Sequence, residues 1–113
     1  MIATLLKAKA DINARGELGL THLMEAAMSN RIDVVTTLLK AGAHINEKNE
    51  FGWTPLMYDA RYSKYPEVIT TLLEAGADLK VKDIQRKTAF DHAKSNEKLK
   101  GTAAYWKLND ALY

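Results

Sequence analysis

The amino-acid sequence repeats itself at a nearly constant interval, and this repeat constrains the fold more than any other feature. The segment LLKAKADIN, which begins at Leu5, recurs as LLKAGAHIN at Leu38, 33 residues later, and as LLEAGADLK at Leu72, a further 34 residues on. A repeat of this length is typical of a supersecondary unit that buries its apolar face only against neighbouring units. The chain is therefore expected to fold as a stack.

Each unit holds two short apolar runs at helical spacing. Thr54 followed by Pro55 is a favourable helix start, because the hydroxyl caps a free backbone N–H and proline at the first position loses no hydrogen bond. Gly42 and Gly76 are expected to end the second helices, since glycine adopts the left-handed cap readily. In the first full unit the apolar positions of the two helices are Leu23, Ala26, Ala27, Val34, Val35, Leu38 and Leu39.

A unit of this length that begins with a T-P-L-x-x-A pattern resembles the ankyrin repeat. The middle unit carries the matching residues Gly52, Thr54, Pro55, Leu56, Ala60, Val68, Leu72, Leu73, Gly76, Ala77 and Asp78. The resemblance implies an all-α solenoid of helix-turn-helix repeats with short β-hairpin-like loops. It divides one domain, 1–113, into a partial repeat (1–15), two full repeats (16–48 and 49–82) and a divergent C-terminal capping repeat (83–113).

Some residues depart from the ankyrin pattern. Met24, Met57 and Asp91 replace the family's usual histidine, so its hydrogen-bond link to the neighbouring threonine is expected to be absent. The last unit lacks the usual second helix. Its Tyr105 and Trp106, with Leu108 or Leu112, are expected to cover the open end of the stack, and Tyr105 and Trp106 are expected to pack in the core rather than to contact a partner.

No catalytic or cofactor site is expected. The chain has no cysteine and no nucleophile, phosphate-loop or paired-carboxylate motif. His22 and Glu25 have metal-pair spacing on one helix, but two ligands without a third make a poor metal site. The sequence therefore predicts a protein that is not an enzyme and has no metal, cofactor or small-molecule substrate.

Charge and hydropathy give no reason to expect a membrane or nucleic-acid partner. The net charge is +2, and no apolar run approaches the roughly 20 residues that cross a bilayer. A basic cluster is interrupted by Asp78 and Asp83 and reads as a solvated face: Lys80, Lys82, Arg86 and Lys87. The N-terminal sequence does not resemble a targeting leader, so a cytoplasmic location is expected.

The ankyrin resemblance implies that a protein partner would bind at the loop tips and the concave face of the first helices. The middle unit is the richest there in aromatic residues and arginine, which often anchor interfaces. Alternatively, Trp53 or Tyr58 packs between units. The candidate partner-binding residues are Leu18, Leu20, Glu25, Met28, Phe51, Trp53, Tyr58, Arg61, Tyr62, Ile84, Lys87 and His92.

The N-terminal half-unit suggests two alternative functions. Met1, Ile2, Leu5 and Leu6 align with positions that are buried in a full unit, yet no first helix precedes them. The chain is then either a structural C-terminal fragment of a longer array, or a homodimer that self-associates through these four residues.

Asp59 stands where the other units have Ala26 and Ala93. An unpaired buried carboxylate is unfavourable and tends to take up a proton. Three interpretations remain. Asp59 reaches solvent at the groove edge, which we favour; it pairs with Arg61, His92 or a hydroxyl; or it is a functional substitution that contacts a partner.

Overall fold

The computed structural model describes residues 15–110 and consists of helices joined by short loops. Within that range there is no strand, and the prediction of an all-α repeat fold is confirmed. A 3-10 turn, η1 (Glu17–Gly19), precedes six helices: α2 (His22–Met28), α3 (Ile32–Lys40), α4 (Pro55–Tyr62), α5 (Pro66–Glu74), α6 (Ala89–Ala93) and α7 (Ala103–Asp110).

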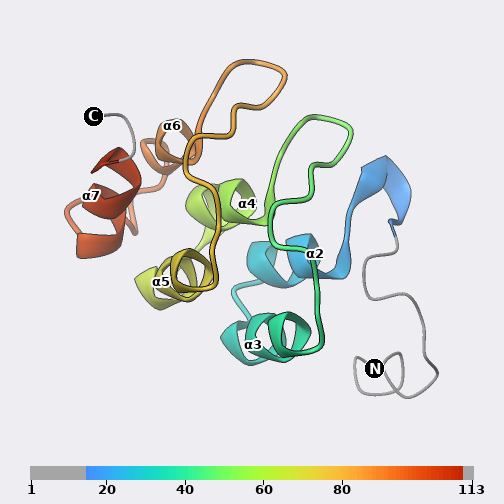
Figure 1. Ribbon diagram of the computed structural model, residues 1–113. Coiled ribbons are helices and arrows are strands. Elements are labelled where there is room, and N and C mark those ends of the chain that lie inside the picture. Colours follow the sequence, from blue (N-terminus) through green and yellow to red (C-terminus); the bar gives the residue numbers. More distant parts are fainter. Residues whose placement is uncertain (1–14, 111–113) are drawn as a thin grey trace.

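The helices form two rows (Figure 1). The first row contains α2, α4 and α6, and the second contains α3, α5 and α7; neighbouring helices pack within each row and between the two rows. The loops that lead into α4 and α6 extend from one side of the stack. The unit boundaries inferred from the sequence stay predictions.

The three first helices begin in the same way. Thr21, Thr54 and Thr88 each cap the helix that follows, because each hydroxyl accepts a hydrogen bond from a backbone N–H three residues later at 3.2–3.3 Å. The apolar faces then form one core along the stack, as the periodicity predicts. Its largest fully buried apolar side chains are Leu23, Met24, Leu38, Leu56, Met57, Ile69, Leu72, Leu99 and Leu108.

The expected loss of the threonine link is wrong at Asp91. Its Oδ2 accepts hydrogen bonds from the backbone N–H of Thr88 at 3.0 Å and from the Thr88 hydroxyl at 3.2 Å. These hydrogen bonds hold the pKa of Asp91 below its ordinary value, despite partial burial. A carboxylate therefore replaces the histidine in this link. Met24 keeps a weaker contact, with its sulfur 3.5 Å from the Thr21 nitrogen.

Adjacent loops lie against each other and need glycine where they meet. The Ile84 nitrogen donates to the Phe51 carbonyl at 3.1 Å, which joins two loops from successive units. Gly52 has φ +77°, and a Cβ at this position would lie 3.0 Å from Asp83 Cα. Both the backbone conformation and the close approach exclude a larger residue at Gly52. At the other end of the units, Gly42 and Gly76 have φ +96° and +101°, as expected for helix caps.

The C-terminal end is covered differently from the sequence expectation. Leu108 is fully buried, and Tyr105 is partly buried with its ring 5.0 Å from the ring of Phe90. Trp106, in contrast, is 54% exposed, so the prediction that it packs in the core is wrong. Leu112 lies outside the described residues. Its role at this end stays a prediction.

Candidate protein-binding site

Two loops are held in shape by equivalent side chains. Asn49 Oδ1 accepts hydrogen bonds from the backbone nitrogens of Phe51 and Trp53, each at 2.9 Å. Asp83 Oδ1 does the same for the nitrogens of Gln85 and Lys87, at 2.8 and 2.9 Å. A side-chain oxygen that binds backbone N–H groups two and four residues later folds each loop into a tight turn.

The remaining polar side-chain atom of Asn49, and that of Asp83, connects its loop to the helix that follows. Asn49 Nδ2 donates to the hydroxyl of Tyr58, on α4. Asp83 Oδ2 lies 2.8 Å from Nε2 of His92, on α6. Tyr58 and His92 occupy equivalent positions in their helices. The two units therefore connect loop and helix at the same place with different side-chain pairs. The loops are therefore fixed to the helices on the face where a partner was expected.

His92 is a structural residue. Its side chain is 1% exposed, so the expectation that it contacts a partner on the exposed side of α6 is wrong. Burial lowers the pKa of His92 more than the adjacent carboxylate of Asp83 raises it, which keeps the ring neutral at neutral pH. Nε2 then carries the ring proton and donates a hydrogen bond to Oδ2 of Asp83. Nδ1 is buried and has no hydrogen-bond partner in the described part of the chain.

The ionised partner of this pair is Asp83. Burial alone would raise the pKa of Asp83, but hydrogen bonds from Lys87 N–H, His92 and Gln85 N–H bring it below its ordinary value. The Asp83 side chain is 0% exposed. The sequence suggested that Asp83 interrupts the basic cluster at the surface. Because it is buried, Asp83 does not do so.

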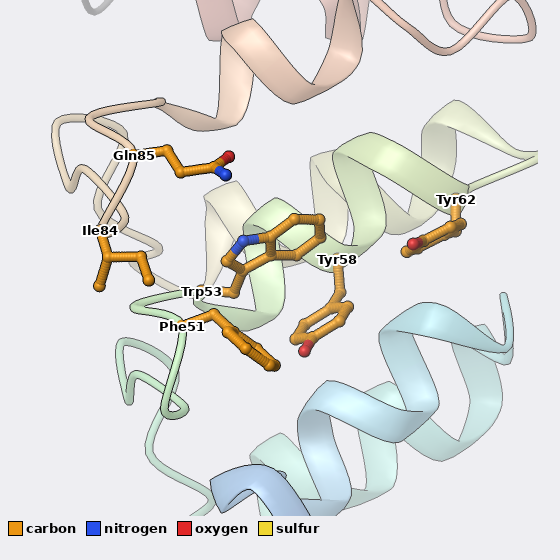
Figure 2. A pocket seen from close by; sticks show the side chains of 6 residues that line it. All are labelled: Phe51, Trp53, Tyr58, Tyr62, Ile84 and Gln85. Atoms are coloured by element: carbon orange, nitrogen blue, oxygen red, sulfur yellow. The ribbon is translucent and has the colours of Figure 1, made fainter.

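Between the two loops and α4 lies a hollow of about 310 Å³, which we call the aromatic pocket. Figure 2 shows Phe51, Trp53 and Tyr58 gathered near the start of α4, with Tyr62 one turn further along and Gln85 extending toward Trp53 from the next loop. The lining residues are Phe51, Trp53, Tyr58, Tyr62, Ile84 and Gln85.

The indole of Trp53 organises the aromatic pocket. The centre of its ring lies 4.8 Å from that of Tyr58 and 6.4 Å from that of Tyr62. The ring of His92 also packs against it, at a distance of 4.1 Å between ring centres. These are the tilted and stacked arrangements that aromatic rings prefer. Trp53 is partly buried, whereas Phe51 and Tyr62 are 43% and 48% exposed. Trp53 thus forms the partly buried base of the pocket, and Phe51 and Tyr62 form its solvent-exposed edges.

The structure brings together only part of the predicted binding set. Five of the predicted residues line the aromatic pocket: Phe51, Trp53, Tyr58, Tyr62 and Ile84. Tyr58 is only 8% exposed and its hydroxyl accepts a hydrogen bond from Asn49, which agrees with the interpretation that it packs inside the stack. Its contact with a partner stays a prediction. The remaining candidates do not line the pocket but are exposed or partly exposed: Leu18, Leu20, Glu25, Met28, Arg61 and Lys87.

Three residues that shape the site were absent from the predicted set. Asn49 and Asp83 form the loops, and Gln85 lines the aromatic pocket. A signal for the first two is present in the sequence. Asn49 and Asp83 occupy the same position in successive units, and each precedes by nine residues the helix residue that it binds.

Asp59 does not reach solvent, so the favoured interpretation of this residue is wrong. Its side chain is buried at 0% exposure, and neither carboxyl oxygen has a hydrogen-bond partner among the described residues. Burial raises the pKa of Asp59 to about 8, although the nearby Ser63 hydroxyl lowers it in part. That hydroxyl donates to the Tyr65 carbonyl at 2.7 Å. Asp59 is therefore mostly a neutral acid at pH 7.

Two further features of the described residues bear on function. Residues 15–110 contain no group of three or more histidine or carboxylate side chains placed to hold a metal ion. In the same part of the chain, no helix is both long and apolar enough to span a bilayer. The proposed self-association residues Met1, Ile2, Leu5 and Leu6 lie outside the described residues, so a homodimer stays a prediction.

The paired rows of helices and the linked loops define a helical repeat protein whose loops lie on one side of the stack. A family model of ankyrin repeats, in three copies, matches residues 1–83. The chain belongs to the ankyrin repeat family. Members of this family are generally protein–protein interaction modules and are typically not enzymes. No curated protein matches the chain significantly.

Proposed function

We propose that this chain is a non-catalytic interaction module that binds a protein partner through its loop tips and the exposed face of α2, α4 and α6. The observation that supports this most is the aromatic pocket. Aromatic side chains provide large contact areas at a small loss of conformational entropy, and residues of this kind carry most of the binding energy in interfaces. A cytoplasmic location stays a prediction.

Exposed apolar residues on successive loops extend the pocket into a longer surface. Leu18 is 51% exposed on the turn before α2, Phe51 is 43% exposed on the next loop, and Ile84 is 70% exposed on the loop after that. The loops that carry them are joined, because the Glu50 nitrogen donates to the Leu18 carbonyl at 3.0 Å and the Ile84 nitrogen donates to the Phe51 carbonyl at 3.1 Å. Such a row of apolar tips suits a partner that lies across several units.

Site-specific photo-crosslinking tests the proposal. A photoreactive amino acid replaces Phe51 in one sample and Tyr65 in another. Tyr65 is 54% exposed but does not line the aromatic pocket, so it controls for exposure. We expect a partner protein to crosslink at position 51 and not at position 65. The purified partner should then bind wild type at least about tenfold more tightly than Tyr62→Ser, because an exposed aromatic side chain that a partner covers contributes at least about 1.4 kcal/mol.

A variant that keeps the fold separates loss of contact from loss of structure. Trp106→Ala removes an equally large exposed aromatic residue from α7, which does not line the pocket. Its affinity for the partner should equal that of wild type. Equal affinity of Tyr62→Ser and wild type, or crosslinking confined to position 65, contradicts the proposed function.

A further inference from the structure

The charges around the aromatic pocket are distributed unequally. Arg61 follows Tyr58 on α4 and directly precedes Tyr62, while Arg86 and Lys87 follow Gln85 on the next loop. Arg86 and Lys87 are exposed and Arg61 is partly exposed. We call Arg61, Arg86 and Lys87 the basic rim.

Two residues of the basic rim follow residues that line the pocket, Arg61 on α4 after Tyr58 and Lys87 on the loop that carries Ile84 and Gln85. Burial lowers the pKa of His92, and the positive charges of Arg61 and Lys87 lower it further. The His92 ring lies 4.1 Å from that of Trp53. Among the side chains that the structure describes, no ion pair involves any residue of the basic rim. Positive charge is therefore available beside the aromatic pocket.

The carboxylate of Asp83 is not exposed to an incoming ligand on this side of the pocket. It is fully buried and is occupied by two backbone N–H groups and the His92 ring. The exposed charge next to Phe51, on the preceding loop, is acidic: Glu50. A ligand that crosses the pocket thus meets positive charge beside Gln85 and Tyr62 and negative charge beside Phe51.

Resting on the proposed function, we infer that the partner presents a peptide segment with one large apolar side chain for the aromatic pocket and acidic residues directly beside it. The apolar residue stacks on Trp53, and the acidic residues face the basic rim. Charge complementarity of this kind fixes orientation and excludes segments of opposite charge. Guanidinium groups add directional hydrogen bonds to carboxylates.

Selection from a random-peptide display library on the full chain tests this inference. We expect enriched peptides to carry a leucine or an aromatic residue with aspartate or glutamate within two positions. Their affinity should fall at least about tenfold in the double variant Arg61→Glu, Lys87→Glu. The control is Lys40→Glu, Lys98→Glu, which makes the same change in net charge at two exposed lysines outside the pocket. It should bind like wild type.

The outcomes separate this inference from the proposed function. Peptides that lose affinity in Tyr62→Ser but show no acidic preference contradict the inference and leave the proposed function standing. Peptides whose affinity is the same in Tyr62→Ser and wild type, or a selection that enriches none, contradict both. If a single-stranded oligonucleotide binds more tightly than every peptide and is lost in Arg61→Glu, Lys87→Glu, the basic rim serves nucleic acid and the inference is wrong.

Discussion

Nε2 of His92 lies 2.8 Å from Oδ2 of Asp83, and both side chains are almost completely buried. This pair supports the proposed binding surface from inside the fold, because it fixes the loop that forms one wall of the aromatic pocket. The previous unit achieves the same with Asn49 and Tyr58. The exposed surface therefore depends on polar contacts that no partner touches.

Removing the carboxylate of Asp83 should destabilise the fold. Asp83→Ala deprives two backbone N–H groups of their acceptor and leaves the His92 ring without its partner. Buried polar groups that lose their partners are unfavourable, and we expect the free energy of unfolding to fall by about 2–4 kcal/mol. Urea denaturation measures it. The exposed Glu74→Ala is the control and should differ from wild type by less than about 0.5 kcal/mol.

A double variant that copies the side-chain pair of the neighbouring unit should restore part of the lost stability. In Asp83→Asn, His92→Tyr the second loop carries the pair that Asn49 and Tyr58 form in the first. We expect this double variant to be more stable than either single variant. If its destabilisation is the sum of the two single effects, the two pairs are not equivalent.

Asp59→Ala should stabilise the protein. The equivalent residues Ala26 and Ala93 are buried at 5% and 0% exposure, so alanine suits this position in a stack. The variant removes an unpaired buried acid, which is unfavourable by about 1–3 kcal/mol even when protonated, and at pH 7 we expect a gain of at least this size, seen as a rise in Tm of several degrees. A fall in Tm of several degrees would mean that Asp59 makes a stabilising hydrogen bond.

Asp59 should also make the free energy of unfolding depend on pH. Burial raises the pKa of Asp59 from 3.8 to about 8. Between these two values the folded protein holds a proton that the unfolded chain releases, so the stability of wild type falls as pH rises through this window. Relative to Asp59→Ala, the loss is about 1.4 kcal/mol per pH unit and ends near pH 8. Unfolding free energies of both proteins at pH 5, 6 and 7 measure it; a constant difference refutes the raised pKa.

Arg86 occupies the left-handed position that glycine fills in the preceding loops. Its φ is +66°, compared with +77° for Gly52 and +76° for Gly19. A side chain in this conformation is unfavourable by about 1 kcal/mol, so Arg86→Gly should stabilise the protein by up to that amount. Gly52→Ala should destabilise it by more, because the added Cβ lies 3.0 Å from the neighbouring loop. Thermal unfolding of the two variants in parallel decides whether the loops follow this rule.

Local patterns explain why the helices could be predicted from the sequence. The spacing of apolar residues, the threonine caps and glycines such as Gly42 act within a few residues, and they repeat in each unit. The stack follows from them, because no single helix pair buries its own apolar face. Five residues that line the aromatic pocket were among the predicted partner contacts, because the ankyrin resemblance places their positions on the loop tips and first helices; that they contact a partner stays a prediction.

The errors concern residues whose partners lie elsewhere in the fold. His92 was expected at the surface, because nothing local shows that Asp83 and Trp53 enclose its ring. Asp59 was expected to reach solvent, because charge usually does, but packing between units buries it completely. Trp106 was expected in the core on hydrophobicity alone. In each case tertiary contacts decided exposure, and the sequence pattern did not contain them.

The two tryptophans allow the central claim to be tested in one spectrum. The chain contains only Trp53 and Trp106, so a ¹H–¹⁵N spectrum of the wild-type protein shows two indole N–H signals, which Trp106→Phe assigns. On titration with a selected peptide or the crosslinked partner, the signal of Trp53 in the aromatic pocket should shift and that of Trp106 on α7 should stay in place. A shift of the Trp106 signal with the Trp53 signal unchanged would contradict the assignment of the binding surface to the aromatic pocket.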